Sequence, residues 1–183
     1  MKNGVMKNRL ESVELGNHII AVYQDKKEKL KEAFDFLKQG LDKDEIVMLV
    51  TDEMSKDEIR RNMQDEWKID VESLESRDHV IIKDVNEWYF QYDGPNAERL
   101  KMHWFALSEI ARVRGKHGIR AVGDMAAFFK RGFVKDLINY ESMLEPKFNI
   151  PMTAICAYDS RDIKALSTEQ FNILCEHHVV LWK

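Results

Sequence analysis

Five short, mostly apolar runs along the chain each end at an aspartate. The runs cover residues 19–23, 47–51, 80–83, 121–123 and 153–158, and the aspartates that follow them are Asp25, Asp52, Asp84, Asp124 and Asp159. Apolar runs of this length are typical of parallel strands that are buried on both faces. If the runs are parallel strands, their acidic ends lie along one edge of the sheet, where open α/β folds bind ligands.

Segments with helical spacing separate these runs. Apolar residues between 30 and 41 recur every three or four positions, opposite a face of Lys and Glu. Ser55 with Glu58 three residues later is a capping-box pattern, which predicts a helix through about Trp67. Further helices are expected over residues 96 to about 115, 132 to about 148, and 167 to 176. This alternation predicts a three-layer αβα fold around a mostly parallel sheet.

The chain divides into a short N-terminal segment and one domain. Residues 1–14 carry mixed charge without a sustained period, so a flexible arm or a short helix is expected there. The chain has 183 residues, 44% of them hydrophobic, so residues 15–183 can bury one substantial core. A single α/β domain is therefore expected over 15–183.

Composition limits the cellular setting and the partners. No apolar stretch reaches the ~20 residues of a membrane span and no signal-peptide pattern is present, so we expect a cytoplasmic protein without membrane contact. Cys156 and Cys175 lack metal-type spacing and are expected to be reduced. A net charge of −4 with small, dispersed basic clusters argues against direct nucleic-acid binding.

The turn after the first expected strand lacks a phosphate-binding loop. A nucleotide-binding protein of this architecture needs glycines there, because only glycine lets consecutive backbone amides cradle phosphate. Residues 23–28 read Tyr-Gln-Asp-Lys-Lys-Glu, which places an acid beside the helix N-terminus, where it would repel phosphate. GxGxxG, GxSxG and HExxH motifs are also missing from the sequence.

A carboxylate completes the apolar stripe of the helix expected after residue 132. The apolar members of that stripe are Val134, Leu137, Ile138, Leu144 and Phe148. Glu141 falls on the same face and should point toward the sheet. Burying an ionised carboxylate without partners costs several kcal/mol, so Glu141 must be paired, coordinated or protonated. A structural bond to Arg120, to His18 or to a backbone amide and a contact with a ligand are both consistent with this position.

Among the strand-end aspartates, Asp124 and Asp159 are the strongest candidates for a ligand site. Asp124 follows Gly123, which permits close backbone approach, and precedes Met125 and Phe128, which are expected to form an apolar wall. Capping of helix N-termini is the alternative role for most of the five aspartates. Converging carboxylates could hold a hard cation, but no DxD or EF-hand spacing supports one, so no metal is assigned and no cofactor is named.

Histidines open the first and the last expected strands. His18 precedes the first, and His177 and His178 precede the last. Their imidazoles could bind a transition metal if the two strands were neighbours, although a histidine satisfied within the core is the commoner situation. Tyr23 and other aromatic residues could line a pocket for a small organic ligand, although most belong in the core at these spacings.

Several short motifs, taken in order, resemble one known family. They are Gly16-Asn-His18 before the strand ending in Tyr23, Gln39-Gly40-Leu41, Gly123-Asp124-Met125, Tyr140-Glu141, Cys156-Ala-Tyr158-Asp159 and His177-His178. Together they resemble the MEDS domain, the methanogen/methylotroph, DcmR-type sensory domain of archaeal and bacterial signalling proteins and regulators. The resemblance covers about residues 14–182. It implies a RecA-like or KaiC-like core without the nucleotide loop, which senses small molecules and has no established reaction.

The resemblance also implies which positions matter. The polar signature of the family falls on His18, Tyr23, Asp124, Glu141, Tyr158 and Asp159. The chain departs from the family pattern at Asp124, where many members carry Glu, and at His178, where they often carry Pro. The shorter side chain of Asp124 keeps the charge but changes its reach.

We therefore expect a stand-alone, non-catalytic sensory module that binds a small organic ligand and passes its occupancy to a separate signalling or transcription-regulator protein. A homo-oligomer is possible. The expected ligand contacts are His18, Tyr23, Asp124, Met125, Phe128, Glu141, Tyr158 and Asp159. A carboxylate-based hydrolytic enzyme, with or without a metal, and a degenerate ATPase-like assembly module are the alternatives.

Overall fold

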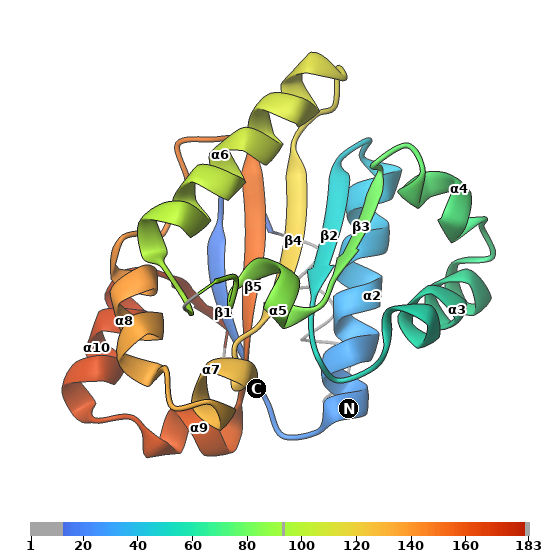
Figure 1. Cartoon of the computed structure of the whole chain (residues 1–183). Coiled ribbons are helices and arrows are strands. Elements are labelled where there is room, and N and C mark those ends of the chain that lie inside the picture. The colour runs from blue at the N-terminus through green and yellow to red at the C-terminus, as the bar shows by residue number, and fades with distance from the viewer. Residues whose placement is uncertain (1–12, 93, 182–183) are drawn as a thin grey trace.

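The computed structural model describes residues 13–92 and 94–181, and most of the predicted N-terminal arm lies outside these ranges. A six-stranded sheet forms the centre, with the strand order β3-β2-β4-β5-β1-β6 (Figure 1). Every neighbouring pair is parallel. The strands are β1 (His18–Tyr23), β2 (Ile46–Val50), β3 (Val80–Lys83), β4 (Ile119–Asp124), β5 (Met152–Asp159) and β6 (Val179–Leu181).

Helices cover both faces of the sheet, which confirms the predicted three-layer αβα fold (Figure 1). One face carries α2 (Lys26–Asp42), α3 (Lys56–Trp67) and α4 (Val71–Glu75). The other carries α5 (Val85–Trp88), α6 (Ala97–Val113), α7 (Ala126–Lys130), α8 (Val134–Ser142), α9 (Ser160–Ala165) and α10 (Thr168–Glu176). The chain changes direction across the sheet after β3, and right-handed crossovers then place the following helices on the opposite face.

Strand register brings the acidic strand ends together. Tyr23 pairs with Asp159, and Asp124 pairs with Ala157, so β1, β4 and β5 end at nearly the same level. The strands are buried on both faces, as their continuous apolar sequences predict. The carboxyl edge of the sheet therefore holds side chains that are more than a hundred residues apart in the sequence.

The helix predicted to run to about residue 148 ends earlier. Helix α8 stops at Ser142, and the chain continues to β5 without helical structure. Pro146 explains the difference, because proline in a helix interior removes a hydrogen bond and clashes with the preceding turn. Phe148 keeps its contact with the core from this loop, and its amide donates to the carbonyl of Gly16 at 2.7 Å.

The aromatic segment around residues 88–92 packs partly into the core. Tyr89 is buried against Phe128, with ring centroids 5.1 Å apart, whereas Tyr92 is 88% exposed. Among the helices of the described residues, none combines the length and the apolar character that a membrane span requires.

Candidate functional site

The eight predicted contact residues fall in three places. Asp124 and Asp159 lie together at the carboxyl edge of the sheet. His18, Glu141 and Tyr158 meet inside the protein, between β1, α8 and β5. Tyr23, Met125 and Phe128 are buried core residues, with Tyr23 on the α2 face of the sheet and the other two on the α6 face.

A buried lysine links the two aspartates of the carboxyl edge. Lys29 Nζ donates to both carboxylate oxygens of Asp124 at 3.2 Å and to Asp159 Oδ1 at 2.9 Å. Its side chain is only 4% exposed. Lys29 projects from the first turn of α2, which follows β1, so the helix delivers a cation to the edge where the strands end.

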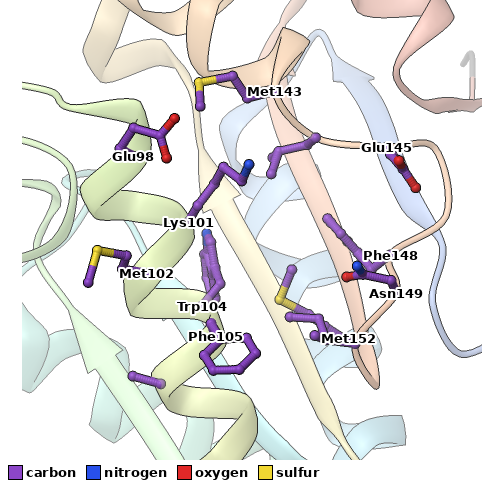
Figure 2. Close-up of a pocket in the computed structure, with 13 residues that line it drawn as sticks. Glu98, Lys101, Met102, Trp104, Phe105, Met143, Glu145, Phe148, Asn149 and Met152 are labelled. Carbon is purple, nitrogen blue, oxygen red and sulfur yellow. The ribbon is translucent and has the colours of Figure 1, made fainter.

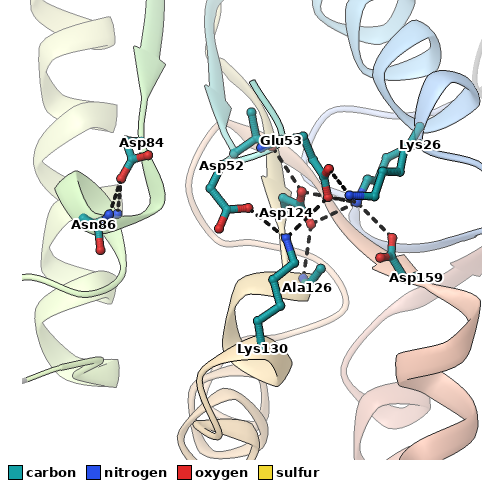
Figure 3. Close-up of polar contacts among 11 residues, drawn as sticks. Lys26, Asp52, Glu53, Asp84, Asn86, Asp124, Ala126, Lys130 and Asp159 are labelled. Carbon is teal, nitrogen blue, oxygen red and sulfur yellow. Dashed lines mark hydrogen bonds and ion pairs between the residues drawn. The ribbon is translucent and has the colours of Figure 1, made fainter. Parts of the chain in front are cut away.

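Further polar contacts saturate this edge. Asp124 also accepts from Thr51 Oγ1 at 3.1 Å and from the backbone amide of Ala126 at 3.1 Å. Glu53 lies 3.4 Å from Lys29 Nζ and also binds Lys26 (Figure 3). Lys130 reaches across from α7 to Asp52 and Glu53 (Figure 3). The carboxylates of this cluster are thus already held by lysines, a hydroxyl and an amide.

The pKa shifts at this edge follow from burial and from these pairs. Burial alone would lower the pKa of Lys29, but the carboxylates of Asp124, Asp159 and Glu53 raise it above its ordinary value. Burial raises the pKa of Asp124 despite the attraction of Lys29. At neutral pH this site therefore consists of a charged lysine in contact with several carboxylates.

Lys29 was missed from the sequence, although a signal is present. It lies one turn before Ala33 on the stripe of α2 that faces the sheet, where a cation requires a partner.

Two of the other strand-end aspartates cap helix N-termini, which is the alternative role expected from the sequence. Asp25 accepts from the amide of Glu28 at 3.0 Å, and Asp84 accepts from the amide of Asn86 at 2.8 Å (Figure 3).

A second polar cluster surrounds Glu141. Glu141 Oε1 accepts from the Tyr158 hydroxyl at 3.0 Å, and Glu141 Oε2 lies 3.3 Å from His18 Nε2 and 3.2 Å from His178 Nε2. Cys156 Sγ lies 3.3 Å from His18 Nε2 and 3.8 Å from Glu141 Oε2. These five side chains are buried, and we call them the Glu141 cluster.

The Glu141 cluster shows which side chains surround the carboxylate on the apolar stripe of α8. Of the structural partners considered for Glu141, His18 is present, whereas Arg120 pairs with Glu45 at 2.6 Å. Strands β1 and β6 are neighbours, which brings His178 beside His18 with ring centroids 3.8 Å apart. Cys156 and His178 were not among the predicted contacts, because their participation depends on strand order.

Burial controls the pKa values within this cluster. It lowers the pKa of His18 in spite of the neighbouring carboxylate. Burial would raise the pKa of Glu141, but the neighbouring His178 and His18 lower it well below its ordinary value. Burial and the Glu141 carboxylate raise the pKa of Cys156 and of Tyr158. Glu141 is therefore the negative centre of the cluster.

An apolar groove opens between α6 and the loop that precedes β5. Its volume is about 550 Å³. Figure 2 shows Lys101 and Trp104 projecting from α6 toward the segment that carries Phe148 and Met152. The lining residues are Glu98, Lys101, Met102, Trp104, Phe105, Ala106, Met143, Leu144, Glu145, Phe148, Asn149, Ile150 and Met152. None of the eight predicted contact residues lines this groove.

The groove and the Glu141 cluster share a wall. A small cavity of about 10 Å³ lies against His18 and Cys156. Four residues line both this cavity and the groove, namely Trp104, Leu144, Phe148 and Met152. A single layer of side chains therefore separates the groove from the polar cluster.

Comparison with known families identifies the chain. The family model described as MEthanogen/methylotroph, DcmR Sensory domain matches residues 17–178. The chain belongs to the MEDS family. MEDS is a family of sensory domains, so a sensory role follows at the level of the family. A search of curated proteins finds no match to the sequence.

Solved structures show what this MEDS domain is similar to in fold. One similar structure is a KaiC-like protein from the hyperthermophilic archaeon Pyrococcus horikoshii OT3, with a TM-score of 0.59 and 15% sequence identity. The match covers 92% of this chain and 73% of the archaeal chain. At this identity the similarity establishes the RecA-like, KaiC-like fold and carries no activity with it.

Proposed function

We propose that this MEDS domain senses a small, largely apolar organic molecule that binds in the groove between α6 and the loop before β5. The observation that carries the proposal is the wall shared by this groove and the Glu141 cluster. A ligand against Trp104 and Phe148 would press on the side chains that enclose His18 and Cys156. Occupancy of the groove would thereby change the packing around the buried Glu141 cluster.

The groove has the size and composition of a ligand site. Small-molecule pockets usually measure roughly 300–1,000 Å³ and are lined mainly by apolar and aromatic side chains. The value of about 550 Å³ lies within that range. Exposed charged residues, Glu98, Lys101 and Glu145, stand among the lining residues and could orient a polar end of the ligand. These features support binding of a molecule with an apolar body.

The carboxyl edge is the less favourable of the two candidate ligand sites. The Asp124 carboxylate is buried and held by Lys29, Thr51 and the amide of Ala126. A ligand there would have to displace a buried ion pair, which costs several kcal/mol. The same saturation weakens the hydrolytic alternative, because its carboxylates would have to leave these partners. We assign the Lys29 network a structural role and assign no reaction to the chain.

Helix α6 is the element most suited to pass on ligand occupancy. Its inner face carries Trp104 and Leu107, which are buried, and its outer face exposes Ile110 and Val113, which lie outside the groove. A ligand that favours one position of α6 would change the outer surface as well. We propose that this surface reports occupancy to a signalling or transcription-regulator protein.

Blocking the groove tests this proposal. Ala106 is exposed and lines the groove, so Ala106→Trp fills the space without entering the core. We expect the variant to lose most of the fluorescence enhancement of 1-anilinonaphthalene-8-sulfonate, an apolar probe, that the wild-type protein gives. Val113→Trp is the control, because Val113 is 75% exposed on the same helix outside the groove. Equal probe binding by both variants and the wild type would refute the groove as the ligand site.

A second variant separates the groove from the carboxyl edge. Asp124→Asn removes the buried charge beside Lys29 and leaves the groove lining unchanged. The folded variant should bind the probe with the affinity of the wild type. Loss of binding in Asp124→Asn with retention in Ala106→Trp would move the ligand site to the carboxyl edge.

A further inference from the structure

Four potential metal ligands converge in the Glu141 cluster. His18 Nε2, His178 Nε2, Cys156 Sγ and a carboxylate oxygen of Glu141 all lie within 4.8 Å of one another, and all four residues are buried. They come from β1, α8, β5 and the segment before β6, so the fold rather than a local sequence motif assembles them.

The backbone fixes the tautomer of both histidines. His18 Nδ1 lies 2.9 Å from the carbonyl oxygen of His177, and His178 Nδ1 lies 2.7 Å from that of Leu174. A carbonyl oxygen only accepts, so each Nδ1 must carry a proton and donate it. The lone pair of each neutral ring therefore resides on Nε2, the atom that faces Glu141. Histidine ligands of metals are commonly oriented by this pattern.

Tyr158 fixes the orientation of the carboxylate. Its hydroxyl donates to Glu141 Oε1 at 3.0 Å, which leaves Oε2 directed at the two imidazoles. Hydrogen bonds of this kind to a ligating carboxylate are typical of the surroundings of metal ligands. His18, His178 and Glu141 thus each have a separate hydrogen-bond partner that fixes the orientation of the side chain.

Four of the six distances between the ligand atoms lie near the values of tetrahedral coordination, and the other two are within 4.8 Å. With Zn–N and Zn–O bonds of about 2.0 Å and Zn–S bonds of about 2.3 Å, tetrahedral geometry separates nitrogen from oxygen by ~3.3 Å and sulfur from either by ~3.5 Å. The two nitrogen-to-oxygen distances here are 3.3 and 3.2 Å. The sulfur lies 3.3 Å from His18 Nε2 and 3.8 Å from Glu141 Oε2.

One ligand atom lacks a hydrogen-bond partner within the part of the chain that the structure describes. His178 Nε2 is buried and forms no hydrogen bond there, although it lies 3.2 Å from Glu141 Oε2. Buried polar atoms are nearly always satisfied, so an orphaned ring nitrogen directed at a carboxylate calls for an explanation. A cation between the two atoms would satisfy both.

We propose that His18, His178, Cys156 and Glu141 bind a divalent transition metal of the Zn²⁺ class. No metal is assigned from the sequence alone, because the spacing of these residues carries no signal until β1 and β6 are known to be neighbours. A mixed set of imidazole, thiolate and carboxylate ligands suits Zn²⁺. Metal binding releases the thiol proton of Cys156 to solvent. The resulting thiolate and the carboxylate of Glu141 together cancel the charge of the ion, so the buried site is neutral overall.

The competing state is a metal-free ion pair in which a proton on one histidine balances Glu141. In that state at most one Nε2 carries a proton, and the other presents a lone pair to the same carboxylate oxygen. The two states differ in a measurable way, because only the first takes up metal and contains a metal–sulfur bond. This inference does not depend on the groove ligand, since metal uptake is measured without any organic molecule.

Metal uptake by the full chain is the test. The purified protein is stripped with a chelator, dialysed and titrated with Co²⁺ and with Zn²⁺. We expect about one equivalent of either metal to bind, a sulfur-to-cobalt charge-transfer band in the Co²⁺ form, and a melting temperature raised by about 5 °C or more by Zn²⁺. Elemental analysis of the unstripped protein supplies an independent measure of the same stoichiometry.

Matched variants locate the ion. Cys156→Ser should abolish the charge-transfer band, whereas Cys175→Ser, at the other free cysteine, should retain it. His178→Gln should lose stoichiometric uptake, and its neighbour His177→Gln should keep it, because the His177 side chain bonds to the Leu144 carbonyl instead. Tyr158→Phe should bind about 10–100-fold more weakly, as expected when the hydrogen bond that orients a ligand is removed.

Three results would overturn the proposal. One is uptake below about 0.1 equivalent by the stripped wild-type protein with an unchanged melting temperature, which would establish the metal-free ion pair. Another is a charge-transfer band that survives Cys156→Ser. The third is equal metal affinity in His178→Gln and the wild type. Circular dichroism of each stripped variant verifies that it is folded, and Tyr158→Phe remains informative if a ligand variant does not fold.

Discussion

At the residue scale, the carboxyl edge depends on Lys29. Its side chain is 4% exposed, and its Nζ lies 3.2 Å from a carboxylate oxygen of Asp124, which is itself buried. A buried carboxylate without a counter-charge is strongly unfavourable, so the lysine and the aspartate are required together rather than singly. Through Asp124 and Asp159, Lys29 joins α2 to the ends of β4 and β5.

Removing the charge of Lys29 should destabilise the fold. Lys29→Met keeps most of the side-chain volume and leaves Asp124 and Asp159 without their shared partner. We expect the free energy of unfolding, measured by urea denaturation, to fall by about 3–5 kcal/mol. Lys31→Met is the control, because Lys31 forms an exposed pair with Asp35 worth about 0.5 kcal/mol.

A double variant distinguishes loss of charge pairing from loss of packing. If the unpaired Asp124 carboxylate is the cause, Lys29→Met combined with Asp124→Asn should recover a large part of the lost stability. A Lys29→Met variant that loses no more stability than Lys31→Met would contradict the structural role of the network.

Stability at high pH follows from buried groups with raised pKa values. Burial raises the pKa of Tyr23 and of Tyr89, and the surrounding carboxylates raise that of Lys29 against the effect of its burial. Below about pH 10 the folded and unfolded states hold the same protons at these groups. Above it the unfolded state releases protons that the folded state retains, so stability falls as pH rises.

The urea midpoint should therefore decrease between pH 8 and about pH 11. Reversibility on return to pH 8 controls for chemical damage. A midpoint that stays constant over this interval would show that these side chains are accessible to solvent in the folded protein.

At the element scale, α2 packs closely against the sheet at Gly40. A Cβ atom added at Gly40 would come within 2.8 Å of Arg120 Cδ and of Val47 Cγ1. Arg120 has little freedom to move, because it is buried, pairs with Glu45 at 2.6 Å and stacks over Phe36 at 4.7 Å. The glycine thus sets the distance between the helix and strands β2 and β4.

Gly40→Ala should destabilise the protein, although alanine is the better helix former. The gain in helix propensity is about 1 kcal/mol. Overpacking against buried neighbours costs about 1–3 kcal/mol, and we expect this cost to prevail. Thermal or urea unfolding measures the balance, and a variant more stable than the wild type would show that α2 can move away from the sheet.

The fold was predictable because its signals are local. Continuous apolar runs identify parallel strands, and helical spacing between them identifies the covering layers. The boundary error at α8 arose where an apolar residue, Phe148, continued the helical spacing beyond a proline. The loop between α8 and β5 packs Phe148 against the core, so its apolar residue falls at the spacing expected of a helix.

The sites were predictable only in part, because they depend on which strands are neighbours. The inward position of Glu141 followed from the stripe of its own helix, and Asp124 and Asp159 followed from their places after strands. The contact of His18 with Cys156, 138 residues away, required the order of β1 and β5. The groove is likewise a property of packing between α6 and a distant loop.

At the scale of the whole molecule, we propose different roles for the two sheet faces. On the α2 face, Lys29 holds the carboxyl edge and the packing at Gly40 holds α2 against the sheet. The α6 face carries the groove, the Glu141 cluster and the exposed side of α6. We assign sensing to the α6 face and support of the fold to the α2 face.

Methionine methyl groups test this assignment most directly, because they are distributed over both faces. Met102, Met143 and Met152 line the groove, whereas Met63 of α3 is buried on the other face of the sheet and Met54 packs there. The measurement is a ¹³C-methyl methionine NMR titration with 1-anilinonaphthalene-8-sulfonate. The account predicts saturable shifts of the three groove methyls with Met54 and Met63 unchanged. Shifts at Met54 or Met63, or none at the groove, would contradict it.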